Sequence, residues 1–136
     1  MSDQPSPTTT AVGLVAGVRS AGIYCGDQDR AKAFWTETMG FTALTDVPMG
    51  EGGERWIEVM PPDGSVKLVL FTPESQRDRV GTWSNLLFRC DDIHATYETL
   101  RARGVAFPEE PREEFWGWWA MFADPDGNTY GLGVND

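Results

Sequence analysis

The hydrophobic pattern of the first half of the chain changes from that of a strand to that of a helix and back. Residues Val18 to Cys25 read as a strand, and apolar residues then recur at helical spacing, at Ala31, Phe34, Trp35 and Met39. Asp27 is expected to cap this helix and Gly40 to end it. Strands are predicted next over 41–45, 56–60 and 66–71, separated by Gly- and Pro-rich turns.

The same order begins again in the second half. A strand is predicted over 85–90, followed by a helix with Ile93, Tyr97 and Leu100 on its apolar side and Gly104 at its end. Equivalent landmarks lie at a nearly constant offset: Asp27 to Asp92 is 92 − 27 = 65, Gly40 to Gly104 is 104 − 40 = 64, and Asp63 to Asp126 is 126 − 63 = 63. The pattern indicates a duplication.

Two βαβββ modules in tandem are therefore expected. The predicted fold is α+β, with a curved mixed sheet, helices outside and a concave cleft on the opposite face. A chain of 136 residues fits one domain, expected over 17–134. Module one is placed at 17–72, a polar linker at 73–81 and module two at 82–134. Residues 1–16, rich in Pro, Ser and Thr, are expected to form a disordered tail without signal-peptide features.

Charge and cysteine content restrict the partners. The chain has 11 Lys and Arg against 21 Asp and Glu, a net charge of −10, which disfavours nucleic acid and anionic membranes and favours solubility or a cationic ligand. No apolar run approaches the ~20 residues that a membrane helix needs. Cys25 and Cys90 lack Cys-x-x-Cys spacing and are expected to be buried thiols. A cytoplasmic protein is predicted.

Two stretches carry a family resemblance. Residues 22–35 (GIYCGDQDRAKAFW), followed by Met39-Gly40-Phe41, and the closing run 121–128 (MFADPDGN) with its Asp-Pro-Asp-Gly-Asn turn, resemble the vicinal oxygen chelate superfamily. This family contains glyoxalases, bleomycin resistance proteins and extradiol dioxygenases. The resemblance implies paired βαβββ modules, often a homodimer, and a ligand cleft lined by the sheets of both modules. It does not imply one reaction.

The resemblance also implies a divalent metal held by four side chains. The corresponding positions are expected at Ser20, Leu68, Asn85 and Gly131, and none is a His or a carboxylate. Such residues do not supply the donors that a first-row metal needs. His94 is the only histidine and is expected in the first turn of the second helix, on the convex side of the fold. We therefore predict neither a metal nor another cofactor, which disfavours metal-dependent glyoxalase I and dioxygenase activities.

Several side chains are candidates for lining the cleft. Tryptophan suits a core, a dimer interface or a ligand site equally, and Trp118 and Trp119 must point to opposite faces of an alternating strand. Arg89 either pairs with an anionic ligand group or with one of the acidic residues. The predicted ligand-binding residues are Tyr24, Trp56, Asn85, Arg89, Trp116 and Trp118.

Three functions remain open. The leading hypothesis is a metal-independent small-molecule-binding protein that sequesters an antibiotic or an aromatic or cationic metabolite. The alternative is a lyase, isomerase or dioxygenase-like enzyme of the same superfamily, with Tyr24 and Glu114 as candidate catalytic residues. A structural interaction module is the third.

Overall fold

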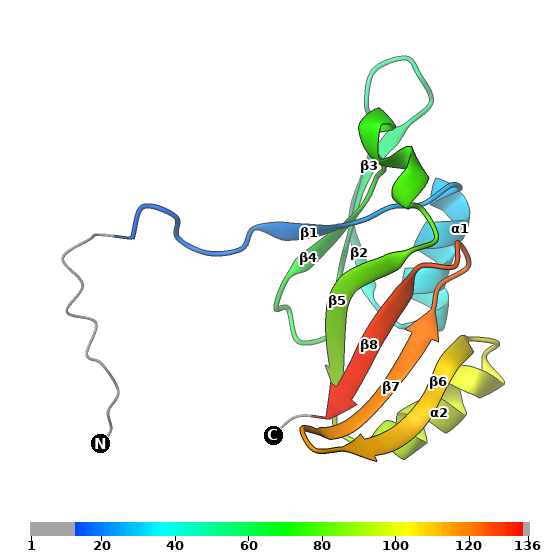
Figure 1. Cartoon of the computed structure of the whole chain (residues 1–136). Coiled ribbons are helices and arrows are strands. Elements are labelled where there is room, and N and C mark those ends of the chain that lie inside the picture. Colours follow the sequence, from blue (N-terminus) through cyan, green and yellow to red (C-terminus); the bar gives the residue numbers. More distant parts are fainter. Residues whose placement is uncertain (1–12, 135–136) are drawn as a thin grey trace.

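The chain folds into two four-stranded sheets, each with helical segments on one side (Figure 1). The computed structural model describes residues 13–134. Most of the predicted N-terminal tail, residues 1–12, therefore lies outside the described residues. None of the helices between residues 13 and 134 is both long and apolar enough to cross a membrane.

The first half follows the predicted order of strand, helix and three strands. Asp27 caps the helix as expected, because its carboxylate accepts a hydrogen bond from the Arg30 amide at 3.0 Å. Gly40 adopts φ +82°, the left-handed conformation that ends a helix without a steric penalty. The elements are β1 (Ser20–Ile23), α1 (Gln28–Ala33), the π-helical segment η1 (Phe34–Thr38), β2 (Thr42–Pro48), β3 (Arg55–Met60) and β4 (Lys67–Leu70).

The second half repeats this order. Asp92 caps its helix through the Ala95 amide at 3.0 Å, and Gly104 adopts φ +92°. The elements are β5 (Trp83–Cys90), α2 (Ile93–Ala102), β6 (Ala106–Glu114), β7 (Gly117–Ala123) and β8 (Thr129–Val134). Between the halves, the segment predicted as a linker contains a 3-10 helix, η2 (Glu74–Arg79), which its polar composition did not predict.

Both sheets have the same topology. The strand orders are β1-β4-β3-β2 and β5-β8-β7-β6, with β1 parallel to β4 and β5 parallel to β8. The remaining neighbours pair antiparallel. The predicted α+β fold with mixed sheets and duplicated halves is confirmed.

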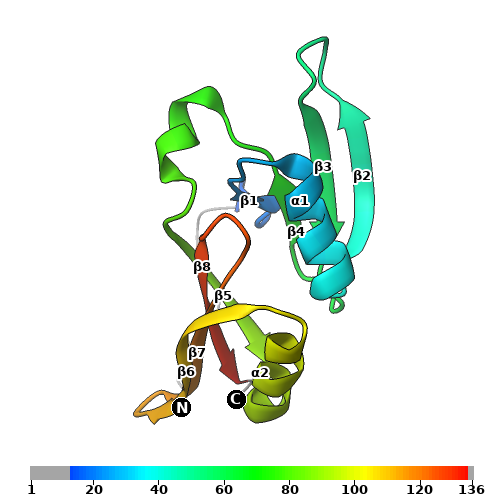
Figure 2. The same ribbon diagram turned by 90° about the vertical axis from the view of Figure 1, so that its right-hand side faces the viewer.

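One core joins the two halves. Trp35 on η1 is fully buried, and its ring lies 5.6 Å from that of Phe88 and 5.3 Å from that of Tyr130, both in the second half. Figure 2 shows α1 beside the first sheet and α2 beside the second. The face of each sheet that turns away from this core and its helix is called its open face below.

A buried polar turn also ties the second half to the first. The Asp124 carboxylate accepts hydrogen bonds from the Asn128 amide, the Asn128 side chain and the Tyr130 hydroxyl at 3.0, 2.8 and 2.6 Å. The Asn128 side chain also donates to the Tyr24 carbonyl at 2.8 Å. Burial raises the pKa of Asp124. The Asp-Pro-Asp-Gly-Asn turn therefore anchors the last hairpin to the end of β1.

Candidate ligand-binding groove

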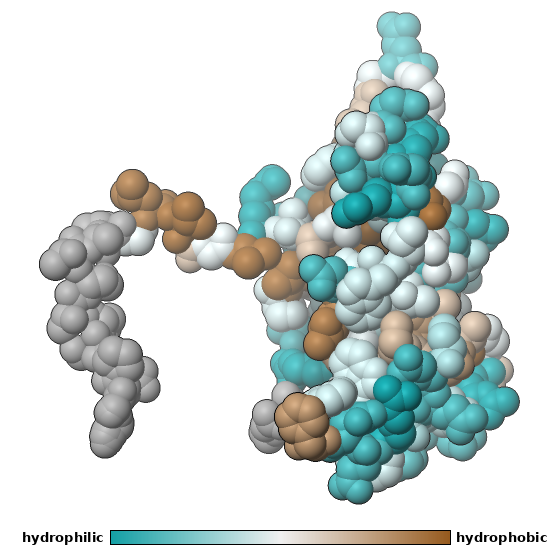
Figure 3. Space-filling view, in the orientation of Figure 1, coloured by the Kyte–Doolittle hydropathy of each residue, from teal (hydrophilic) through white to brown (hydrophobic). Residues whose placement is uncertain are grey.

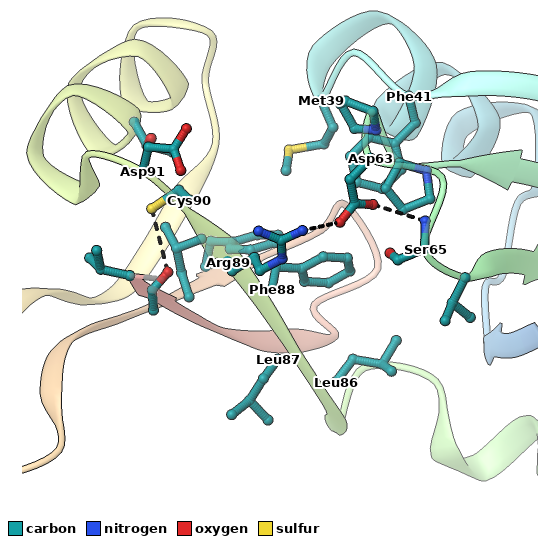
Figure 4. A pocket seen from close by; sticks show the side chains of 18 of the residues that line it. Met39, Phe41, Asp63, Ser65, Leu86, Leu87, Phe88, Arg89, Cys90 and Asp91 are labelled. Carbon is teal, nitrogen blue, oxygen red and sulfur yellow. Dashed lines mark hydrogen bonds and ion pairs between the residues drawn. The ribbon is translucent and has the colours of Figure 1, made fainter. Parts of the chain in front are cut away.

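A groove of about 760 Å³ runs along β5 between the two halves (Figure 4). Its size is within the range of sites for drug-sized ligands. Residues of both halves line it. The residues that line it include Met39, Phe41, Asp63, Leu87, Phe88, Arg89, Asp91, Leu100, Trp116, Trp118, Trp119 and Gly133.

The walls of the groove are mainly apolar. Met39 directly follows η1, Phe41 directly precedes β2, and Phe88 lies on β5. Figure 4 shows Met39, Phe41 and Phe88 facing one space. Three tryptophans of the second half, Trp116, Trp118 and Trp119, complete the lining. Such walls suit an apolar or aromatic molecule.

Arg89 and Asp63 form an ion pair in this groove. Arg89 Nη2 lies 2.5 Å from Asp63 Oδ2, and the Ser65 amide donates to Asp63 Oδ1 at 3.0 Å (Figure 4). The hydrogen bonds of Ser65, followed by that of Arg89, hold the pKa of Asp63 below its usual value. Over half of the Arg89 side chain remains exposed. With Asp91, the groove has two carboxylates and one guanidinium.

The open face of the second sheet has a strip without side chains. In β8, Tyr130 and Leu132 are buried in the core, whereas the alternate positions that face the open side are Gly131 and Gly133. Gly131 pairs with Leu87 on β5 and Met121 on β7. We call Gly131 and Gly133 the glycine strip.

The Trp119 indole covers one end of this strip. Trp119 pairs with Gly133, and a Cβ at Gly131 would overlap Trp119 Cη2 and lie 2.9 Å from its Cζ3. The Trp116 ring lies 6.3 Å from that of Trp119. The outer edge of the Trp119 ring therefore lies over Gly131, while Gly133 has no side chain of the described residues within 4 Å of its Cβ position.

The open face of the first sheet is filled by its own side chains. The Trp56 and Phe71 rings lie 6.0 Å apart. Glu58, only 7% exposed, accepts hydrogen bonds from Trp56 Nε1 at 3.1 Å and Thr45 Oγ1 at 2.9 Å, and Lys67 Nζ lies 3.6 Å away. The Trp56 and Thr45 hydrogen bonds lower the pKa of Glu58.

The groove contains some of the residues predicted from the sequence. Arg89, Trp116 and Trp118 line it; among the described lining residues, Tyr24, Trp56, Asn85 and Glu114 do not appear. Glu114 forms an ion pair with Arg112. Asn85 is exposed in an irregular part of β5, with φ +66°.

The two adjacent tryptophans point to opposite sides, as alternation requires. Trp118 packs against the core on the helix side, where its ring lies 4.7 Å from that of His94. Trp119 lies on the open face. The sequence predicted that only one of the two indoles faces the cleft, with Trp118 as the candidate, whereas both line the groove. The signal for Trp119 was the pair of glycines at alternate positions of β8.

Comparison with known proteins gives the family. The model of the Glyoxalase/Bleomycin resistance protein/Dioxygenase superfamily matches residues 17–132. The chain belongs to this superfamily. It is 34% identical over 117 residues to the uncharacterised protein YetH of Bacillus subtilis (strain 168), a match that covers 86% of this chain and 97% of YetH.

Two solved structures of the superfamily are similar to this chain. A member from Sphaerobacter thermophilus DSM 20745 superposes with a TM-score of 0.80 at 32% identity, covering 90% of this chain and 99% of the other. TnmS3, an antibiotic binding protein from Streptomyces sp. CB03234, superposes with a TM-score of 0.76 at 37% identity, covering 90% and 98%.

The superfamily's metal does not fit the residues present. Gly131 lies beneath the Trp119 indole, so a ring occupies the space that a metal-binding side chain would need. Ser20 and Asn85 are weak donors for a transition ion. Within residues 13–134, no three His, Cys, Asp or Glu side chains lie close enough to hold a metal together.

The prediction that Leu68 occupies the fourth metal position is wrong by one residue. Leu68 packs in the core, 3% exposed, whereas Lys67 and Val69 alternate with it on the open side. The error arose because β4 begins three residues after Gly64 and β8 only two residues after Gly127. Lys67 and Val69 provide no better metal ligands, since an ammonium group repels a cation and valine has no donor atom.

Proposed function

We propose that this protein binds a small, largely apolar molecule in the groove along β5 without a metal ion. The observation that carries the proposal is the groove itself, about 760 Å³ in volume, with aromatic walls and the Arg89–Asp63 ion pair. Such a site favours binding by burial of apolar surface, with a few polar groups to orient the ligand.

The similarity to TnmS3 supports this function. TnmS3 is an antibiotic binding protein, and the two chains are 37% identical over nearly their full lengths. By this likeness, sequestration of an antibiotic or of an aromatic or cationic metabolite is the proposed role. The net charge of −10 favours the approach of a cation.

The enzyme alternative receives no support from the geometry. Among the described residues, neither Tyr24 nor Glu114 lines the groove. Glu114 forms an ion pair with Arg112 instead. The proposal is therefore binding rather than turnover.

Titration with a panel of aromatic antibiotics and dyes tests the function. Tryptophan fluorescence should change saturably for at least one compound, and the same compound should raise the melting temperature, because a ligand that binds only the folded state stabilises it. A panel without a single saturable response would contradict the proposal.

A matched pair of variants tests whether the ligand binds in the groove. Leu87→Gln replaces an apolar groove side chain that is 65% exposed by a neutral polar one, and Leu44→Gln makes the same change on β2, outside the groove, at a residue that is 49% exposed. Both side chains already face solvent, so the fold should tolerate each change. Leu87→Gln should weaken binding by about tenfold, about 1.4 kcal/mol, and Leu44→Gln should leave it unchanged.

We further propose that the protein acts as a cytoplasmic homodimer with no nucleic-acid partner. Large apolar side chains are exposed at Leu14, Val15 and Phe115, and Figure 3 shows apolar surface along the arm that leads to β1. Cys25 and Cys90 are free thiols, as in a reducing compartment. Light scattering after size exclusion should give twice the chain mass; a single-chain mass would contradict the dimer.

A further inference from the structure

The groove along β5 passes around a free strand edge. Within residues 13–134, β5 pairs with β8 alone, which leaves its second edge free. Side chains alternate along β5: Leu87 and Arg89 are exposed on the open face, whereas Phe88 and Cys90 are half-buried and pack against the core. All four line the groove. The groove therefore has a part on each side of β5, and we call the part beside Phe88 and Cys90 the core-side compartment.

Both halves of the chain line the core-side compartment. Its residues come from the segment after η1, from the core side of β5 and from α2, and Met39 and Phe88 face one space (Figure 4). The core residues Phe122 and Leu132 also line the groove, so this side reaches the hydrophobic core. The residues that define the compartment are Met39, Phe41, Phe88, Cys90, Thr96 and Leu100.

The six residues of this compartment bring no charge into it. Only Thr96 and Cys90 have a polar side-chain group, and the Cys90 thiol already donates to the Gly133 carbonyl at 3.6 Å. Burial raises the pKa of this thiol, so it stays protonated at neutral pH. The neighbouring Asp91 carboxylate is exposed. A charged ligand group would lose its water here without gaining a partner, so the compartment favours an uncharged group.

The aromatic side chains of the compartment leave no room for a further ring between them. The Phe41 and Phe88 ring centroids lie 6.1 Å apart, and the Trp35 ring lies behind both, at 5.3 and 5.6 Å. A ring inserted between two others needs roughly 7 Å, because each carbon–carbon contact takes about 3.5 Å. An aliphatic chain is narrower and can follow the ring edges, and the flexible Met39 side chain can adapt to it.

We propose that the core-side compartment binds an uncharged aliphatic chain. This inference rests on the proposed binding function and assigns the aliphatic part of a ligand to the core side of β5, apart from the open face. The driving force is the burial of CH₂ groups between the two halves. Affinity should therefore rise with chain length until the compartment is full.

The test titrates the full chain with uncharged alcohols from n-pentanol to n-octanol. Protein labelled at its methionine methyl groups gives few NMR signals, and Met39→Leu identifies the signal of Met39. This signal should shift saturably, and the Kd should fall about fourfold for each added CH₂ until the compartment is full. Met49, 40% exposed and outside the groove, is the internal control and should not saturate. A Met39 signal that saturates with none of the alcohols, or a Kd that does not depend on chain length, would overturn the inference.

A matched pair of variants on α2 locates the bound chain. Thr96→Leu fills the compartment with an apolar side chain, whereas Thr99→Leu places the same side chain at an exposed position outside the groove. Leucine favours a helix more than threonine does, so both variants should fold, which thermal melting checks. Thr96→Leu should weaken n-octanol binding at Met39 about tenfold, and Thr99→Leu should change it less than about twofold.

A variant on the open face separates the two sides of β5. Leu87→Gln should leave n-octanol binding unchanged, because Leu87 points away from the core-side compartment. An equal loss of affinity in Leu87→Gln or in Thr99→Leu would overturn the inference. If n-octanol saturates the Met39 signal but no panel compound binds the wild-type protein, the proposed function fails and the aliphatic site is retained. If a panel compound binds and no alcohol does, only the aliphatic site fails.

Discussion

The two open sheet faces come from the same duplicated unit but are filled in opposite ways. Trp56 on β3 and Trp119 on β7 occupy equivalent places. Trp56 lies two residues before Glu58, which pairs with β4, and Trp119 lies two residues before Met121, which pairs with β8. Trp56 packs against Phe71. Trp119 faces Gly133 and instead folds over Gly131.

This difference shows how two copies of one unit can differ on equivalent faces. On the first sheet, Phe71, Val69 and the Glu58 network occupy the face. On the second sheet, Gly133 carries no side chain between Arg89 and Trp119. We expect changes on the first face to alter mainly stability and changes on the second to alter the proposed binding.

The largest expected effect is the loss of stability when the hydrogen bonds of Glu58 on the first open face are removed. Glu58→Ala removes the buried acceptor of Trp56 and Thr45 and should lower the free energy of unfolding by about 2 kcal/mol, because buried donors lose their partner. The equivalent change on the second face, Met121→Ala, should cost only about 1 kcal/mol of partly buried apolar surface. Urea denaturation measures both. Equal losses would show that the two faces do not differ in this way.

The two equivalent tryptophans should differ in their effect on ligand binding. For a compound of the antibiotic and dye panel that binds the wild-type protein, Trp119→Ala should raise the Kd about tenfold, about 1.4 kcal/mol, because Trp119 lines the groove. Trp56→Ala should leave the Kd unchanged, since Trp56 contacts Phe71 and Glu58 instead. Fluorescence titration measures both variants, and a loss of affinity in Trp56→Ala would indicate that the first face also binds the compound.

Low pH should weaken the hydrogen bonds of Glu58 on the open face of the first sheet. The pKa of Glu58 lies below its ordinary value of 4.5 in the folded protein, first through the Trp56 and then through the Thr45 hydrogen bond. The folded state then binds fewer protons than the unfolded state, so this group stabilises the protein above its unfolded pKa, and that stability is lost as pH falls through the folded pKa. Urea midpoints between pH 6 and about pH 3 should fall less steeply in Glu58→Gln than in the wild type.

The smallest effect is expected at the exposed ion pair. Asp63→Asn removes the ion-pair partner of Arg89, and exposed ion pairs contribute little to stability. The urea midpoint should therefore stay within error of the wild type. Freed from Asp63, Arg89 should bind an anionic flat dye, anthraquinone-2-sulfonate, more tightly, and added salt should reduce that gain. Arg77→Gln, at a similarly exposed ion pair with Glu54, is the control.

Much of the fold followed from local signals in the chain. The helical spacing around Trp35, the caps at Asp27 and Asp92 and the constant offset between the halves predicted the two βαβββ units. The Asp-Pro-Asp-Gly-Asn turn supported the family. These features depend on neighbours within a few residues, so they can be recognised without the tertiary structure.

The site was only partly predictable. Alternation showed that Trp118 and Trp119 point apart, yet which one lies on the open face depends on which face of β7 meets α2. The position of Leu68 was missed because one additional residue between Gly64 and β4 shifts the alternation, and a shift of one residue moves every side chain to the other face.

By itself, then, the sequence determined the duplicated fold, the capped helices and the lack of metal-binding side chains at the expected positions. Only the tertiary structure decided that Phe71 fills one open face, that Trp119 covers Gly131 and that Gly133 is bare. The physical reason is that periodicity reports which residues share a face of one strand, whereas the space above a residue depends on side chains from neighbouring strands that are distant in the sequence.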